Sequence, residues 1–121
     1  MKVDPSRLAW AAGILEGEGC FSLHYRKHKS GNIHPSFAIH CEMTDEDVIE
    51  YLQETFNVGT ICYREGRERA SGYIGKDSTI WSVQKQEHIL QVLRLIEPWL
   101  FSRRKEKVTE MIKLLEVKCK K

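Results

Sequence analysis

The sequence predicts a single α+β domain in which helices pack on a four-stranded antiparallel sheet. Apolar residues repeat at helical spacing in four segments, and apolar and polar residues alternate over residues 20–27, 35–43 and 79–85. The segments follow the order helix, strand, strand, helix, strand, strand, helix, helix. A chain of 121 residues without repeats or low-complexity segments fits one domain, 1–121, that is large enough for a core.

The first helix has the clearest signals. Asp4 is a suitable N-cap, and Pro5 suits the first helical position. The apolar stripe of this helix comprises Leu8, Ala11, Ile14 and Leu15. A second stripe contains only small residues, spaced four apart: Ala9, Gly13 and Gly17. Because glycine inside a helix costs about 1 kcal/mol relative to alanine, this stripe predicts that something approaches the backbone closely.

Two carboxylates, Glu16 and Glu18, lie at the C-terminal end of this helix. The helix dipole disfavours anions there by roughly 0.3–1 kcal/mol each. This placement favours a functional carboxylate at the end of the helix. The simpler alternative is an ordinary packed amphipathic helix with a solvated polar end.

A hairpin is expected next, from strands at residues 20–27 and 35–43 joined by a turn at residues 29–32. Its inward-facing residues are expected to be Phe21, Leu23, Tyr25, Phe37, Ile39, Cys41 and Met43. Thr44 or Asp45 then caps a helix with an acidic solvent face. The apolar face of that helix comprises Val48, Ile49, Leu52 and Phe56.

The second half of the chain repeats this alternation less regularly. Residues 57–59 end the helix, a third strand covers 60–64, and 65–78 form a long loop or an irregular hairpin tip. Thr79–Lys85 is the fourth strand. A helix over His88–Leu100 ends or kinks near Pro98. Ser102 caps a last helix over Arg103–Val117, and residues 118–121 form a loose tail.

Composition and charge narrow the functional classes. No apolar run is long enough to span a bilayer, and no signal peptide is recognisable. The four cysteines are widely spaced, which is typical of reduced, intracellular, soluble proteins and not of a disulfide framework. The net charge is only +2, but bases cluster at 26–29, 64–69 and 103–105, and acids cluster at 42–54. This polarised pattern is compatible with nucleic acid as a partner and gives no indication of a membrane.

Residues 11–19, AAGILEGEG, resemble the nine-residue motif of the LAGLIDADG homing endonucleases, and Cys20-Phe21 resemble its continuation. Glutamate stands at both acidic positions where the name-giving motif has aspartate, and Ala11 replaces the leading leucine. The resemblance extends to the strand-to-helix junction at 41–52, to the Pro-aromatic-apolar stretch at 98–100 before the bases at 103–105, and to the order of elements along nearly the whole chain. It implies an αββαββα domain with a saddle-shaped sheet and a C-terminal helix.

A single motif per chain implies a homodimer of this family. The small stripe allows two copies of the first helix to pack around a two-fold axis, with Ala9, Gly13, Gly17 and Glu16 at the interface. That packing brings the two Glu18 carboxylates together, where they repel unless one is protonated or a cation lies between them. Mg²⁺, or another divalent cation such as Mn²⁺, suits oxygen ligands. Glu18 is therefore the expected metal ligand, with the carbonyl of Gly17 or Gly19 as a helper.

The resemblance also implies a basic residue that stabilises developing charge on the phosphate. Arg103 lies at that position, and Arg104 and Lys105 are close alternatives. The family often has glutamine at a position near the end of the second strand that helps to place water. Met43 stands there, so Glu42 beside it is the other candidate for a catalytic role.

The outward face of the sheet is the expected DNA surface, because a two-stranded ribbon fits the major groove; an ordinary solvated face is the alternative. The expected DNA-binding residues are Ser22, His24, Arg26, His28, Ser36, Ala38, His40, Arg64, Arg67, Arg69, Ser82, Gln84, Arg104 and Lys105. His24 and His28 lack partners at zinc-ligand spacing. The sequence thus predicts a homodimeric, metal-dependent endonuclease that cuts both strands of a long, nearly palindromic DNA site. The alternative is a non-cleaving DNA- or RNA-binding module, such as a splicing maturase or a transcription regulator.

Overall fold

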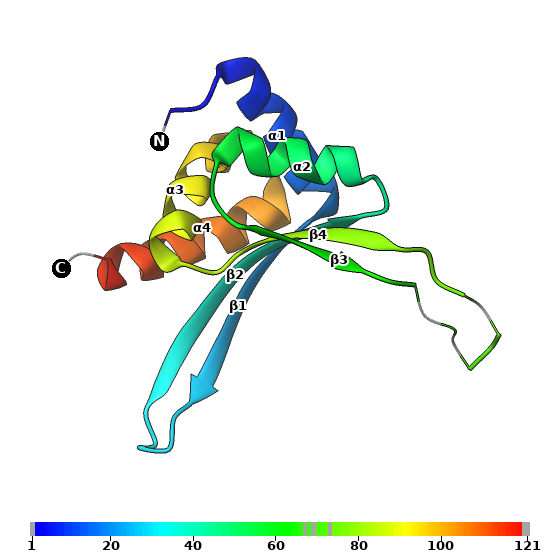
Figure 1. The fold of residues 1–121 in the computed structure, drawn as a ribbon. Helices are drawn as coiled ribbons and strands as arrows, with labels where there is room; N and C mark the ends of the chain where they lie inside the picture. The colour runs from blue at the N-terminus through cyan, green and yellow to red at the C-terminus, as the bar shows by residue number, and fades with distance from the viewer. Residues whose placement is uncertain (1, 67, 69, 73, 120–121) are drawn as a thin grey trace.

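A computed structural model describes residues 2–66, 68, 70–72 and 74–119. All four helices lie on one face of a single sheet, whose two hairpins diverge below them like the two sides of a saddle (Figure 1). The strands are antiparallel neighbours in the order β1-β2-β4-β3. The elements are α1 (Pro5–Glu18), β1 (Gly19–Lys27), β2 (Ile33–Met43), α2 (Glu46–Phe56), β3 (Thr60–Arg64), β4 (Ser78–Val83), α3 (Gln86–Ile96), the 3₁₀ turn η1 (Glu97–Trp99) and α4 (Ser102–Lys118). The predicted α+β class and element order are confirmed.

The core lies between the helices and the upper face of the sheet. Helix α1 begins as predicted, with the Asp4 carboxylate accepting a hydrogen bond from the Arg7 backbone N–H at 3.2 Å. Its residues Ala11 and Leu15 are fully buried. The other helices bury the faces that their spacing predicts, and Trp81 at the centre of β4 stacks on Phe56 with ring centroids 5.7 Å apart. The helical layer thereby leaves the opposite face of the sheet uncovered.

The β1–β2 hairpin extends beyond this helical layer (Figure 1). Its register pairs Gly19 with Cys41 at the base and Lys27 with Ile33 near the tip. Phe37, midway along the hairpin, is buried, but Tyr25 is 60% exposed and Ile33 is 65% exposed because no helix of the described residues covers the tip. The sequence placed Tyr25 on the inward face, and burial of that residue was the wrong expectation.

Several boundaries differ from the predictions by a few residues. Strand β2 begins two residues early, at Ile33, and β4 ends at Val83, so Gln84 follows the strand. The helix expected over His88–Leu100 begins at Gln86 and ends at Ile96. Pro98 lies in the 3₁₀ turn that follows, because a proline has no backbone N–H to continue an α-helical ladder.

The predicted cap of the last helix is wrong. Phe101 is the N-cap of α4, and Ser102 is its first residue, with a positive φ of 37°. The helix continues to Lys118, so only Cys119 of the predicted loose tail is described outside it. The Asp45 cap of α2 is in the predicted position, although its side chain makes no capping hydrogen bond. Within the described ranges, no helix combines the length and apolar character needed to cross a membrane.

Candidate active site and nucleic-acid interface

The end of α1 presents Glu18 to solvent at the point where the helix becomes a strand. Gly19 is buried at this junction, and its backbone N–H donates to the Leu15 carbonyl. A β-carbon on Gly19 would lie 2.5 Å from that carbonyl oxygen. Only glycine therefore fits here without moving backbone, and the tight turn brings the Glu18 carboxylate to the base of the β1–β2 hairpin.

A cationic pocket adjoins this junction. Arg104 of α4 is half-buried, and its Nη1 donates a hydrogen bond to the Gly19 carbonyl. Arg103 is exposed beside it. The pocket has a volume of about 370 Å³ and is lined by Gly19, Cys20, Phe21, Arg103, Arg104 and Lys107. None of these lining residues is acidic, and three of them carry basic side chains that can attract an anionic group.

Sequence reasoning identified two of these three cations and missed the third. Lys107 lies four residues after Arg103, so both project from the same face of α4. That spacing was the available signal. Lys105, expected as an alternative to Arg103, is exposed and does not line the pocket.

Cys41 pairs with Gly19 across the hairpin, and the pKa of its thiol is sensitive to the charge of Glu18. Burial and, to a smaller extent, the negative charge of the nearby Glu18 carboxylate together raise the pKa of the Cys41 thiol from 9.0 to about 11. The thiol therefore stays protonated at neutral pH. Glu18 thus lies within electrostatic reach of the sheet, beside the end of β2.

The two candidates at the end of β2 point in different directions, because successive strand residues face opposite sides. Met43 is half-buried and packs against the core under the helices. Glu42 lies on the outward face, where its Oε2 accepts a hydrogen bond from Ser78 Oγ at 2.5 Å and lies 3.5 Å from Arg64 Nη1. Among the described residues, no three histidine, cysteine or acidic side chains converge as a metal site.

The outward face brings together most of the predicted DNA-binding residues. Strand register places Cys20 beside His40, Ser22 beside Ala38, and His24 beside Ser36. His40 in turn lies beside Ser82, with Nδ1 and Oγ 3.0 Å apart. A hollow of about 390 Å³ in this face is lined by Ser22, His24, Arg26, Ser36, Phe37, Ala38, His40 and Gln84.

The other predicted DNA contacts do not line this hollow. His28 stacks edge-on against His34 near the hairpin tip, with centroids 4.4 Å apart. Arg64 extends the outward face on β3, while Arg104 lines the cationic pocket. Arg67 and Arg69 lie outside the described residues. The uncovered sheet face therefore carries hydroxyl, imidazole and guanidinium groups, which suit hydrogen bonding to base edges and phosphates.

The small stripe of α1 lies partly at the surface. Ala9 is half-buried, Gly13 and Gly17 are exposed, and no atom of another element lies within 4 Å of a β-carbon built on either glycine. Glu16 is half-buried, and its Oε2 has no hydrogen-bond partner in the described part of the chain. This face of α1 has space for a closely approaching backbone.

A family model for LAGLIDADG endonucleases matches residues 11–115. The chain belongs to the LAGLIDADG endonuclease family. The match begins within α1 and ends in α4, so it includes the Glu18 junction, the whole sheet and the cationic pocket. No curated protein matches the sequence.

Solved structures share the LAGLIDADG fold at low sequence identity. I-Vdi141I, an archaeal intron-encoded homing endonuclease complexed with DNA, has a TM-score of 0.74 at 12% identity over 95% of this chain and 70% of its own. I-TnaI, a homing endonuclease, has a TM-score of 0.69 at 18% identity over 99% of this chain and 76% of its own. I-CvuI, bound to the I-CreI target with 2 mM Mg and the DNA not cleaved, gives 0.68 at 15% over 92% of this chain. The chain spans 66% of I-CvuI, slightly less than two thirds.

Proposed function

We propose that this LAGLIDADG chain is one subunit of a homodimeric, site-specific DNA endonuclease. The proposal is carried by one observation: the exposed Glu18 immediately precedes Gly19, which lines a pocket with Arg103, Arg104 and Lys107 at the base of an uncovered, polar sheet face. A phosphate of DNA lying along that face can enter the pocket while Glu18 stays at its margin. Membership of the family and the DNA complexes of I-Vdi141I and I-CvuI support the same substrate class.

Helix α1 and the sheet have separate roles in the proposed dimer. Two copies of α1 pack through Ala9, Gly13 and Gly17, so that each subunit brings its own sheet to one half of a nearly palindromic duplex. The outward residues contact the grooves and the backbone, and cleavage of the two strands leaves cohesive 3′ ends. Such a dimer reads a site about twice as long as one subunit spans.

The site fits a divalent cation in part. One chain contributes the Glu18 carboxylate, and the Gly19 carbonyl already accepts a hydrogen bond from Arg104. The Gly17 carbonyl is the other candidate helper. Mg²⁺ keeps several waters and is often bound by only one or two protein carboxylates, so two Glu18 residues from two subunits would suffice. A bound Mg²⁺ or Mn²⁺ would supply an activated water and offset charge on the leaving oxygen.

The protein's own cations act on the phosphate. Arg103 and Lys107 project from one face of α4 and offset the charge that develops on the phosphate oxygens. Arg104 donates a hydrogen bond to the Gly19 carbonyl. This contact links the helix-to-strand junction that carries Glu18 to helix α4. Of the two candidates at the end of β2 for placing the attacking water, Met43 packs against the core, whereas Glu42 lies on the outward face and is engaged by Ser78 and Arg64.

One observation favours a second function, a non-cleaving DNA- or RNA-binding module. Met43 packs against the core and offers no hydrogen-bonding group where the family often has glutamine. A protein of this kind would keep the nucleic-acid surface and lose hydrolysis.

Cleavage of a randomised, nearly palindromic duplex library separates the two functions. We expect cuts that require Mg²⁺ and that disappear in Glu18→Gln, while Glu18→Gln still binds DNA. The Glu87→Gln variant, which changes a carboxylate in the first turn of α3, is the control and should cleave normally. Salt-sensitive binding without cuts by the unaltered protein would establish the non-cleaving module instead.

A further inference from the structure

Three polar side chains from three strands meet on the outward face. Glu42 of β2 accepts from Ser78 of β4 at 2.5 Å and pairs with Arg64 of β3 at 3.5 Å. All three contribute to the lining of a hollow of about 560 Å³, at the base of the loop between β3 and β4. The same carboxylate oxygen of Glu42 serves both partners, so its side chain has one defined orientation.

That orientation leads away from Glu18. Strand register puts Ser78 beside Arg64, whereas Glu42 lies beside Ile80. The Glu42 side chain therefore reaches diagonally along β4 toward β3. Strand β1, whose first residue follows Glu18, lies on the other side of β2. The partners of Glu42 therefore belong to the outward face of the sheet and not to the Glu18 junction.

Stability does not account for this arrangement. The side chains of Arg64 and Glu42 are 63% and 41% exposed. An ion pair this exposed contributes about 0–1 kcal/mol to folding. The effect of the pair is instead to restrict the rotamers of the long Arg64 side chain on a surface that faces solvent. A guanidinium held in place before binding loses less conformational entropy when it contacts a ligand.

We propose that Glu42 is a positioning residue that orients Arg64 to read guanine at one symmetry-related pair of positions in the DNA site. This inference rests on the proposed binding of duplex DNA. Glu42 engages Nη1 of Arg64, which leaves the edge formed by Nε and Nη2 for the O6 and N7 acceptors of guanine in the major groove. The Ser78 hydroxyl donates to Glu42 and fixes the carboxylate.

Base preferences test the proposal. Libraries of randomised duplexes are selected by binding in EDTA, so that the readout does not depend on cleavage, and the profiles of variants are compared. Arg64→Ala should lose a guanine preference of about 5- to 100-fold at one pair of positions. Glu42→Gln should weaken the same preference by about threefold to tenfold, because a neutral hydrogen bond is roughly half as strong as a charge-assisted one. Ser78→Ala should also weaken the guanine preference at the same positions, because it removes the hydroxyl that donates to Glu42.

A matched ion pair supplies the control. Glu116 pairs with Arg94 at 3.3 Å with similar exposure, between α3 and α4 on the helical layer. Glu116→Gln should leave the profile unchanged. A Glu42→Gln profile identical to that of the unaltered protein would overturn the proposal, as would lost cleavage with an unchanged profile, which would assign Glu42 to hydrolysis. Selective binding without cleavage contradicts only the endonuclease proposal, whereas no sequence-selective binding overturns both.

Discussion

At the scale of single residues, Gly19 determines whether the Glu18 junction can form. Its φ of −75° suits any residue, so the constraint is steric: a β-carbon would lie 2.5 Å from the Leu15 oxygen and 3.0 Å from the Leu15 Cα. These are backbone atoms of a buried helical turn and cannot move alone. We expect Gly19→Ala to destabilise the fold by about 1–3 kcal/mol, as overpacking does in well-packed sites. Urea unfolding measures this loss.

Gly17, two residues earlier, is the internal comparison for Gly19. A β-carbon there meets no atom of another element within 4 Å. Gly17→Ala should therefore keep or raise the stability of the subunit, because alanine is the better helix former. Equal losses in the two variants would show that the contact with Leu15 does not explain the sensitivity of Gly19.

Residue patterns predicted the position of Glu18 better than the arrangement of its neighbours. The helical spacing and the motif placed Glu18 at the end of the first helix, where the structure has it. Which base of 103–105 turns toward Gly19 depends on how α4 is rotated against the sheet, and successive helical residues differ by about 100°. Only the packed structure supplies that rotation, which is why the contact of Arg104 with Gly19 was not predicted. The opposite orientations of Glu42 and Met43 follow from strand alternation alone.

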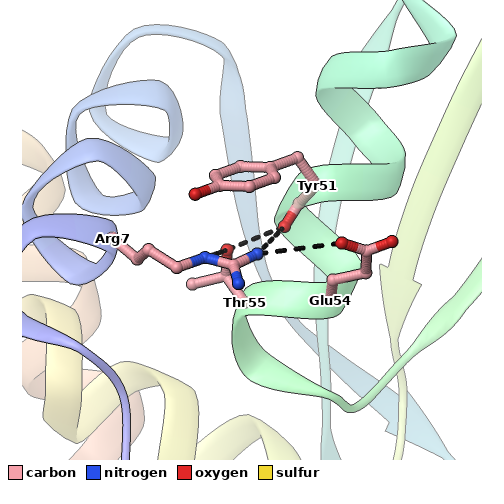
Figure 2. Close-up of polar contacts among 4 residues, drawn as sticks. All are labelled: Arg7, Tyr51, Glu54 and Thr55. Carbon is pink, nitrogen blue, oxygen red and sulfur yellow. Dashed lines mark hydrogen bonds and ion pairs between the residues drawn. The ribbon is translucent and has the colours of Figure 1, made fainter.

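At the scale of elements, Arg7 joins α1 to α2, and Figure 2 shows its contacts. Its Nε donates to Thr55 Oγ1 at 3.2 Å, its Nη2 donates to the Tyr51 carbonyl at 3.3 Å, and its guanidinium lies 3.9 Å from the centre of the Tyr51 ring. Glu54 adds a weak ion pair at 3.9 Å. The planar guanidinium makes all these contacts at once and so links the first turn of α1 to α2.

Lysine cannot reproduce this geometry, because an ammonium is a point charge without a planar fork. We expect Arg7→Lys to lower the free energy of unfolding by about 1–2 kcal/mol, less than the loss of a fully buried charged pair because the site is partly exposed. Thermal and urea unfolding measure it. Arg94→Lys, at the single exposed contact with Glu116, is the control and should change stability by less than about 0.5 kcal/mol. Equal effects at the two sites would refute the role of Arg7.

Elements were predictable where one face is buried and one is solvated. The spacing of Ile49, Leu52 and Phe56 identified α2 because those residues pack on the sheet. Element ends were less predictable, since local geometry decides them: Ser102 has the chemistry of a cap, yet the backbone of Phe101 takes that position. Tyr25 alternates correctly but stays exposed, because the length of the hairpin relative to the helices is a tertiary property.

At the scale of the whole molecule, the exposed small stripe of α1 should control assembly. The space around Gly13 admits a larger side chain in the single subunit, and leucine is a good helix former. In the proposed homodimer that space holds the backbone of the partner's α1. The substitution Gly13→Leu therefore separates folding from assembly, because it blocks a close helix contact without disturbing the core of its own subunit.

We expect Gly13→Leu to fold, as judged by circular dichroism, and to sediment as a monomer at concentrations where the unaltered protein is a dimer. Because a nearly palindromic site needs two subunits, the variant should also lose paired cleavage of both strands. Lys113→Leu on α4 adds the same exposed side chain away from α1 and should leave the dimer intact. A Gly13→Leu dimer, or an unaltered protein that is monomeric with and without DNA, would move the interface away from α1. The two Glu18 carboxylates would then not share a site, and the cation proposed between them would need ligands from one chain alone.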